Sequence, residues 1–302
     1  MNKLTVLGLK MDMIIPSRFN ISKPRLKFSK MHGAGNDFVI LDLRGTHYPD
    51  IGLCRFLTDR HKGVGCDLIL GVDIPKNKES IASYHIWSSD GSKSRQCGNG
   101  ARCVAAWLIR EGLACDASFS LDSPSGLLSV EITQDGEFCI GMGIPNFLPS
   151  DIPLFNFAQQ QLEYTVRITE NDVTFSALSM GNPHAVIEVD DIETAAVQST
   201  GPAIQQSLFF EPTVNVGFVQ ITSRKEILLR VFEFGAGETL ACGSGACAAV
   251  AALIRKGKLD NSVTVILLGG KLKIEWKDET SPIFMTGPVD FTYEGEIVNG
   301  NL

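Results

Sequence analysis

Short apolar runs separated by turn residues dominate the chain. Residues 38–41 read Phe-Val-Ile-Leu, a continuous apolar run that is typical of a buried strand. Apolar and polar residues alternate over 118–121 and 127–132, and 263–267 is rich in β-branched residues. Turn residues such as Gly-Asn-Asp at 35–37 lie between such runs. The pattern predicts a protein built mainly of strands.

Two stretches depart from this pattern, and each starts at a cysteine. Residues 97–106 read Cys-Gly-Asn-Gly-Ala-Arg-Cys-Val-Ala-Ala, and 242–249 read Cys-Gly-Ser-Gly-Ala-Cys-Ala-Ala. In both, a glycine-rich turn leads into a helix-forming, alanine-rich segment. The first turn of a helix has unpaired N–H groups and a partial positive charge, which lower the pKa of a thiol and bind a carboxylate. The repeat predicts two thiols that share one carboxylate-bearing substrate.

The strands and the cysteine-led helices occur twice in the same order, which predicts an α+β fold of two similar halves. The predicted divisions are an N-terminal extension at 1–25 (with Met11 or Met13 as alternative starts), a first half at 26–143 with Cys97, a linker at 144–160, and a second half at 161–302 with Cys242. Two such halves would turn their helix N-termini into a shared cleft, where ligands commonly bind.

Charge and hydropathy exclude several classes of partner. The chain has 302 residues and a net charge of −7, without the basic footprint of a nucleic-acid-binding protein. No apolar stretch approaches the ~18 residues that cross a membrane. The apolar run at 4–9 ends at Lys10 and Asp12 without a cleavage site, so we expect no export signal and a cytoplasmic protein.

Eight cysteines are too few for a disulfide scaffold in a chain of this length, so reduced thiols are expected. Six of them are interpreted as small buried apolar residues: Cys54, Cys66, Cys103, Cys115, Cys139 and Cys247. A zinc site built from Cys97, Cys103, Cys242 and Cys247 is an alternative, but spacings of five and four residues within helices disfavour it. A thiol oxidoreductase would be expected to show Cys-x-x-Cys, which the sequence lacks. A dinucleotide-binding site would need a third glycine after the Gly-x-Gly segments at 33–35 or 98–100, and neither segment has it. Both classes are therefore poorly supported.

Several longer motifs carry a family resemblance. They lie at 28–38, 89–92, 97–103, 180–186 and 237–246. From about residue 26 to 295 the chain resembles the diaminopimelate epimerases, two-cysteine amino acid isomerases that need no pyridoxal phosphate or other cofactor. The resemblance implies two similar halves, each a β-barrel-like sheet around a central helix, and a homodimer.

Inversion of a stereocentre explains the need for two thiols, because a proton leaves one face of the carbon and another arrives on the opposite face. The resemblance assigns these roles to Cys97 and Cys242, with His184 beside Cys97 and Glu233 beside Cys242. It implies that the following residues contact the substrate: Asn36, Gly98, Asn99, Asn182, Asn215, Gly243 and Ser244. Each of these residue types also has a purely structural interpretation. The cysteines could be ordinary buried thiols, the histidine a turn residue, the glutamates solvated charges, and the asparagines turn formers.

Three positions depart from the family pattern. Leu68, Ser88 and Phe234 stand where the epimerases have glutamine, asparagine and arginine. Loss of the arginine removes a bidentate clamp for the distal carboxylate of diaminopimelate and adds aromatic surface. We therefore expect retained Cα chemistry with a changed side-chain pocket.

The changed pocket suits histidine or another neutral amino acid. Diaminopimelate remains the alternative if a neighbouring lysine or arginine replaces the clamp. The sequence leaves open whether the enzyme serves lysine biosynthesis or a specialised pathway to a D-amino acid.

Overall fold

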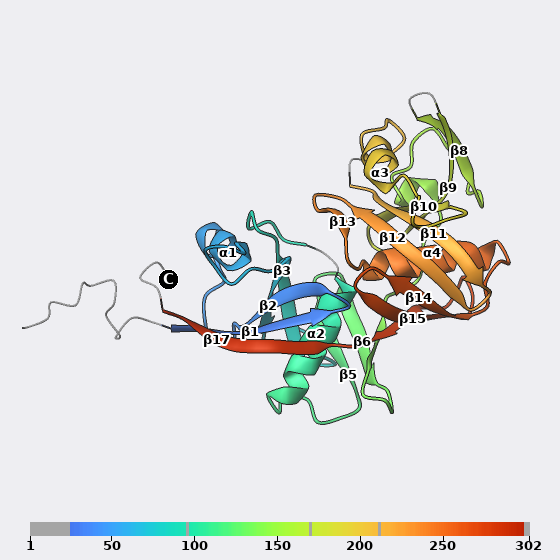
Figure 1. Ribbon diagram of the computed structural model, residues 1–302. Coiled ribbons are helices and arrows are strands. Elements are labelled where there is room, and N and C mark those ends of the chain that lie inside the picture. The colour runs from blue at the N-terminus through green and yellow to red at the C-terminus, as the bar shows by residue number, and fades with distance from the viewer. Residues whose placement is uncertain (1–24, 95–96, 169–170, 211–212, 299–302) are drawn as a thin grey trace, which may run out of the picture.

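A large mixed β-sheet with few helices organises the chain (Figure 1). The computed structural model describes residues 25–94, 97–168, 171–210 and 213–298. Apart from Arg25, the predicted N-terminal extension lies outside the described residues. No helix in the described ranges is long and apolar enough to cross a membrane.

The elements follow one another in two series. The first series is β1 (Arg25–Gly33), β2 (Asn36–Asp42), α1 (Ile51–Thr58), β3 (Leu68–Asp73), β4 (Ala82–Trp87), α2 (Gly98–Arg110), β5 (Ser118–Ser123), β6 (Gly126–Ile132) and β7 (Phe138–Gly141). The second is η2 (Pro149–Asp151), β8 (Tyr164–Ile168), β9 (Asn171–Ser179), β10 (Pro183–Glu188), α3 (Val197–Gln205), β11 (Asn215–Ser223), β12 (Glu226–Glu233), β13 (Gly237–Thr239), α4 (Gly243–Arg255), β14 (Ser262–Leu267), β15 (Gly270–Trp276), β16 (Ile283–Gly287) and β17 (Asp290–Val298). The four strand segments predicted from hydropathy fall within β2, β5, β6 and β14.

The strand pairings repeat. From β1 to β7 they alternate antiparallel and parallel (β1–β2, β2–β3, β3–β4, β4–β5) and then continue antiparallel through β6 and β7. The same order of pairing types runs from β9 through β10, β11, β12, β14 and β15 to β16. Pairing of β7 with β16 makes the sheet continuous.

Both cysteine-led helices are crossover connections. Parallel strands need a connection that crosses the sheet, and α2 supplies it between β4 and β5, while α4 supplies it between β12 and β14. Residues 98–108 of α2 and 243–253 of α4 are buried. Small residues on every side of a helix suit such a position, because strands can then pack closely around it.

The predicted divisions stay predictions, and two of them make contacts beyond their own bounds. The predicted second half ends at residue 302, but β17 pairs with β1 from Asp290↔His32 to Val298↔Arg25, at the start of the chain. The predicted linker at 144–160 is also not a free connection. Ile152 and Leu154 are buried in the core beneath β8 to β11, because this segment supplies apolar side chains to that core.

The interpretation of the remaining cysteines holds for four of six. Cys54, Cys66, Cys103 and Cys247 are buried, and Cys139 is half-buried. Cys115 is exposed, so the prediction for this residue is wrong. It follows the C-terminal end of α2, where the chain leaves the core before β5 begins.

Close packing at Gly269 supports the turn that carries Asn36. A β-carbon at Gly269 would lie 2.1 Å from the carbonyl oxygen of Ala34, in the turn between β1 and β2. We expect Gly269→Ala to lower the free energy of unfolding by about 1–3 kcal/mol, because backbone and not a flexible side chain must move. Gly217→Ala in β11 is the control, since its β-carbon would meet Leu229 at an ordinary 3.4 Å. Urea denaturation measures both; equal stability of the two variants would contradict the packing argument.

Candidate active site

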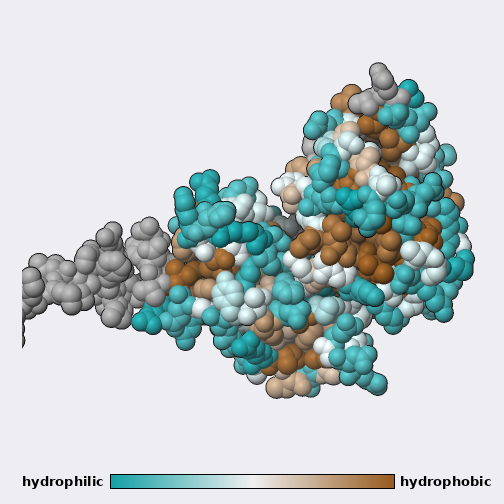
Figure 2. Space-filling model, in the orientation of Figure 1, coloured by the Kyte–Doolittle hydropathy of each residue, from teal (hydrophilic) through white to brown (hydrophobic). Residues whose placement is uncertain are grey.

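The N-terminal ends of α2 and α4 open into one cavity of about 1330 Å³, which both Cys97 and Cys242 line. The space-filling view shows the surface indented between the part with α1 and the part with α3 (Figure 2). The predicted contact residues also line the cavity: Asn36, Leu68, Ser88, Gly98, Asn99, Asn182, Asn215, Phe234, Gly243 and Ser244. The two thiols thus share one cavity, as the sequence predicted.

Met285 on β16 explains why glycine follows each cysteine. A β-carbon at Gly98 would lie 2.4 Å from the Met285 methyl, and one at Gly243 would lie 2.9 Å from the Met285 sulfur. Asn99 adds a direct link, since its Nδ2 donates to the carbonyl oxygen of Ala241 at 3.4 Å. Close contact through one methionine therefore brings the two cysteine turns together.

Burial determines the protonation of both thiols in this structure. It raises the pKa of Cys97 to about 12, although the N–H of Gly100 donates to the sulfur at 3.3 Å and offsets part of the shift. Burial also raises the pKa of Cys242 well above its usual value, and the carboxylate of Glu233 adds to the shift. The sequence predicted lowered thiol pKa values from the helix ends alone. That expectation is wrong for the free enzyme, because desolvation outweighs the helix N-terminus.

Glu233 lies beside Cys242, as the resemblance implied. Its carboxylate hydrogen-bonds the Cys242 thiol and accepts from Thr239 Oγ1 at 2.5 Å. Burial raises the pKa of Glu233, and the hydrogen bonds from Thr239 and Cys242 counter part of that shift. A carboxyl group in these surroundings can take the proton of the thiol, which would leave a thiolate in the cavity.

Cys97 has a different partner. Its thiol donates to Oδ1 of Asn36 at 3.6 Å, and Nδ2 of Asn99 donates to the same oxygen at 3.4 Å. An amide oxygen takes up no proton at ordinary pH, so this thiol is held protonated.

His184 lies outside the cavity lining, and its ring is buried. Its Nε2 hydrogen-bonds Oδ1 of Asn182 at 3.1 Å, and Asn182 Nδ2 donates to Ser244 Oγ at 3.4 Å. Burial lowers the pKa of His184 to about 3, so the ring is neutral. The role of His184 as the partner of Cys97 stays a prediction, since the structure connects it to Asn182.

Asn182 and Asn215 both present amide NH₂ groups. The oxygen of Asn182 is used by neutral His184, and Oδ1 of Asn215 accepts from the backbone N–H of Phe234 at 3.0 Å. Each NH₂ group also has one acceptor within the protein, Ser244 Oγ at 3.4 Å for Asn182 and the carbonyl oxygen of Pro183 at 3.5 Å for Asn215. One of the two amide hydrogens of each asparagine is thus left for a ligand. A group with hydrogen-bond acceptors suits this part of the cavity.

Cations near the changed positions have other partners. Lys30 and Arg60 line the cavity but form ion pairs with Asp37. Lys93 also lines it, and its ammonium lies 5.6 Å from the ring centroid of Tyr48. Phe234 is 52% exposed and brings an aromatic surface to the cavity. In this structure, none of these three cations takes over the position of the missing arginine.

Arg102 does not line the cavity but binds Asn99, which does, and the sequence analysis did not single it out. It is fully buried in α2, and its Nη2 donates to Asn99 Oδ1 at 2.9 Å. No carboxylate of the described residues forms an ion pair with it, and its Nε has no partner. Burial lowers the pKa of Arg102. A charged residue just before the apolar middle of α2, at 103–109, was the available signal.

The zinc alternative has no support in the geometry. In the part of the chain that the structure describes, no three His, Cys, Asp or Glu side chains are grouped to hold a metal ion. Cys103 and Cys247 are buried inside α2 and α4, away from the turns that hold Cys97 and Cys242.

Comparison with known proteins identifies the family. The sequence model of diaminopimelate epimerase matches residues 28–148 and 176–292. The chain belongs to the diaminopimelate epimerase family. It is 54% identical to an O-ureido-serine racemase of Streptomyces lavendulae, over 92% of this chain and 97% of that protein. It is 51% identical to a diaminopimelate epimerase of Xanthomonas campestris pathovar campestris, over 90% and 96%.

Solved structures agree in fold. A probable proline racemase of Agrobacterium radiobacter is 14% identical, with a TM-score of 0.69 over 90% of this chain and 92% of that one. A hydroxyproline epimerase of Agrobacterium vitis has the same identity and TM-score, over 93% of each chain. With its family established, the protein is an isomerase, a cofactor-independent amino acid racemase or epimerase.

The Glu233–Cys242 contact predicts a change in thiol reactivity. Glu233→Gln removes a carboxylate that raises the pKa of Cys242, so more of the thiol is ionised at any given pH below that pKa. We expect iodoacetamide to modify Cys242 roughly tenfold faster at pH 8, which corresponds to about one pKa unit. Peptide mass spectrometry measures the rate, with exposed Cys115 as the internal reference.

Glu238→Gln is the matched control for that experiment. Glu238 also lines the cavity, but its carboxylate binds Arg230 at 2.6 Å and Gln198 at 2.6 Å. Its replacement should leave the Cys242 rate unchanged. Equal acceleration in both variants would mean that general charge, not the Glu233 contact, controls the thiol.

Proposed function

We propose that this protein racemises a neutral amino acid at Cα, with Cys97 and Cys242 as the two proton carriers. The observation that carries the proposal is the single cavity lined by both thiols, each at the N-terminus of a buried helix. Two proton carriers on opposite sides of one carbon are what inversion requires. Repeated strand pairings support the accompanying proposal that the fold consists of two pseudo-symmetric halves. The homodimer and the cytoplasmic location stay predictions.

The α-carboxylate binds at the helix ends in this proposal. The turns at Gly98–Asn99 and Gly243–Ser244 expose backbone N–H groups, and buried Arg102 adds positive charge near Asn99. Loss of the Cα proton spreads negative charge into this carboxylate. Donors already in place for the carboxylate then stabilise the carbanion without rearrangement.

Proton transfer starts from the pair of Cys242 and Glu233. The thiol proton moves to Glu233, and the resulting thiolate takes the proton from Cα. The Cys97 thiol donates its proton to the opposite face of the carbanion, so that Cys97 becomes the thiolate while Cys242 is a thiol. A proton then returns from Glu233 to the Cys97 thiolate through water, which restores the starting state, so no net proton is gained or lost. The opposite enantiomer reacts in the reverse sense.

The side-chain end of the cavity supports a neutral substrate with hydrogen-bond acceptors. Phe234 and Leu68 are apolar, while Asn182 and Asn215 present NH₂ donors. A ureido group is neutral and has a carbonyl oxygen, and the relative at 54% identity is an O-ureido-serine racemase. We therefore propose O-ureidoserine, or a substrate of the same class, as the first compound to test. Diaminopimelate is the second candidate, favoured by the Xanthomonas relative at 51% identity.

Removal of either thiol should stop inversion. We expect Cys97→Ala and Cys242→Ala each to lower kcat for racemisation by about 10²–10⁴-fold, because each removes one proton carrier. Chiral chromatography of O-ureidoserine, histidine and meso-diaminopimelate measures the activity, and Cα deuterium uptake in D₂O measures proton exchange. Cys115→Ala is the control, since Cys115 is exposed and outside the cavity lining. Activity retained in either cavity variant would refute the two-thiol mechanism.

Position 234 should control the choice of substrate. Phe234→Arg restores a planar donor for a distal carboxylate, so we expect kcat/KM for diaminopimelate to rise about 10- to 100-fold relative to the neutral substrate. Phe234→Lys is the comparison, since it adds the charge without the bidentate geometry and should give a smaller change. An equal loss for both substrates in both variants would mean that Phe234 supports the fold and not the selectivity.

A further inference from the structure

We propose that Asp67 is a positioning residue that holds the Asn36 amide with its oxygen toward Cys97 and so keeps that sulfur protonated in the free enzyme. The inference rests on the proposed role of Cys97 as a proton carrier. Asp67 precedes β3 and makes no hydrogen bond to Cys97 in the structure; it acts through Asn36.

The contacts of Asn36 define which way its amide points. Its Nδ2 donates to Asp67 Oδ2 at 2.8 Å, and its Oδ1 receives the thiol of Cys97 at 3.6 Å and Nδ2 of Asn99 at 3.4 Å. A carboxylate only accepts hydrogen bonds, so Asp67 binds the NH₂ side of the amide and leaves the oxygen for the sulfur. Rotation of the amide by half a turn would place Oδ1 of Asn36 against the carboxylate of Asp67. This is unfavourable because both oxygens only accept hydrogen bonds.

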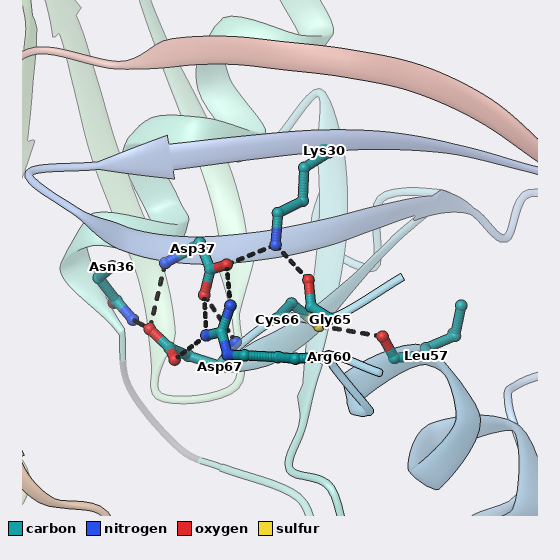
Figure 3. A network of polar contacts seen from close by, with 8 residues as sticks. All are labelled: Lys30, Asn36, Asp37, Leu57, Arg60, Gly65, Cys66 and Asp67. Atoms are coloured by element: carbon teal, nitrogen blue, oxygen red, sulfur yellow. Dashed lines mark hydrogen bonds and ion pairs between the residues drawn. The ribbon is translucent and has the colours of Figure 1, made fainter. Parts of the chain in front are cut away.

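Asp67 is itself held in place by an ionic network (Figure 3). Arg60 Nη2 donates to Asp67 Oδ1 at 2.8 Å, and the two guanidinium nitrogens of Arg60 bind both oxygens of Asp37 at 2.8 Å. Lys30 binds Asp37 from the other side and also donates to the carbonyl oxygen of Gly65. Burial alone would raise the pKa of Asp37, but hydrogen bonds from Arg60 and Lys30 hold it well below its ordinary value.

The backbone reinforces this arrangement. The N–H of Asp37 donates to Asp67 Oδ2 at 3.2 Å, and the N–H of Asp67 donates to Asp37 Oδ1 at 2.9 Å. The turn that carries Asn36 and the segment that carries Asp67 are therefore joined reciprocally. Such a network restricts the carboxylate of Asp67 to one orientation, which a single surface ion pair does not achieve.

The resulting surroundings make the two thiols unequal. Charged groups that act on the Cys97 sulfur are Asp67, Glu233 and Arg102, and the phenol of Tyr84 interacts with it. Only an amide oxygen accepts its hydrogen bond, whereas the Cys242 thiol meets a carboxylate that can take its proton. The free enzyme is therefore prepared for the enantiomer whose Cα–H faces Cys242.

The test measures Cys97 directly and needs no substrate. Wild type, Asp67→Asn and Arg60→Gln are treated with iodoacetamide from pH 6 to pH 9, and the rate at Cys97 is read by peptide mass spectrometry relative to exposed Cys115. In Asp67→Asn the new amide can donate to Asn36 Oδ1, so the Asn36 NH₂ can turn to the sulfur and stabilise a thiolate. We expect Cys97 to react roughly tenfold faster.

Arg60→Gln separates positioning from simple charge. Loss of a cation by itself disfavours a thiolate and would slow the reaction, whereas release of Asp67 and Asn36 would speed it. We expect an increase of about threefold, smaller than in Asp67→Asn because Asp67 keeps its backbone contact. Asp42→Asn is the matched control. Asp42 lies in β2, the strand that also carries Asn36, but it binds Arg44 and lies outside the cavity lining. The rate at Cys97 in this variant should therefore equal that of wild type.

Two results would overturn the proposal. One is an unchanged Cys97 rate in Asp67→Asn; the other is a slower rate in Arg60→Gln, which would leave charge alone as the cause. Modification of buried Cys54 and Cys103 would report that a variant is unfolded. If Asp67→Asn unfolds, the result for Arg60→Gln decides, because the Arg60 side chain is 55% exposed. Failure of the two-thiol mechanism itself would appear only in the racemisation assays, so the two outcomes are distinguishable.

Discussion

The close approach of two helix N-termini is the constraint on which the site depends. Each helix is the crossover between two parallel strands, so its start lies where the sheet topology places it. Met285 fits between the two starting turns only because Gly98 and Gly243 have no side chains. The glycines thus serve the packing of the turns and at the same time leave backbone N–H groups free to meet a carboxylate.

The same packing explains why the thiols are protonated at rest. Helix N-termini favour a thiolate, but burial removes the water that would solvate it, and desolvation dominates at both sulfurs. In the proposed mechanism, an ionised thiol is therefore a state that forms only during turnover, when Glu233 takes the proton of Cys242. A permanently ionised pair would lack the thiol that returns a proton to the carbanion.

Sequence reasoning identified the parts of the site that depend on local chemistry. The cysteine-led turns and the helices that follow them agree with the structure, because the local glycine and alanine pattern carries this information. The contact of Cys242 with Glu233 also agrees, but it was implied by the family resemblance and not by spacing. Long-range features were not predictable in the same way. The pairing of β17 with β1 and the burial of Arg102 depend on which segments meet in space. His184 illustrates the limit, since its motif was recognised but its contact is with Asn182.

The backbone at residue 234 is compatible with a change of substrate preference in which the proposed chemistry is retained. Asn215 is held by the main-chain N–H of Phe234, a contact that any non-proline side chain at this position can make. The preceding residue, Glu233, holds its contacts with Thr239 and Cys242 independently of the neighbouring side chain. A substitution at 234 therefore alters the half-exposed wall of the cavity and leaves the proposed proton carriers in place. Selectivity and proton transfer are adjacent in sequence but depend on different atoms.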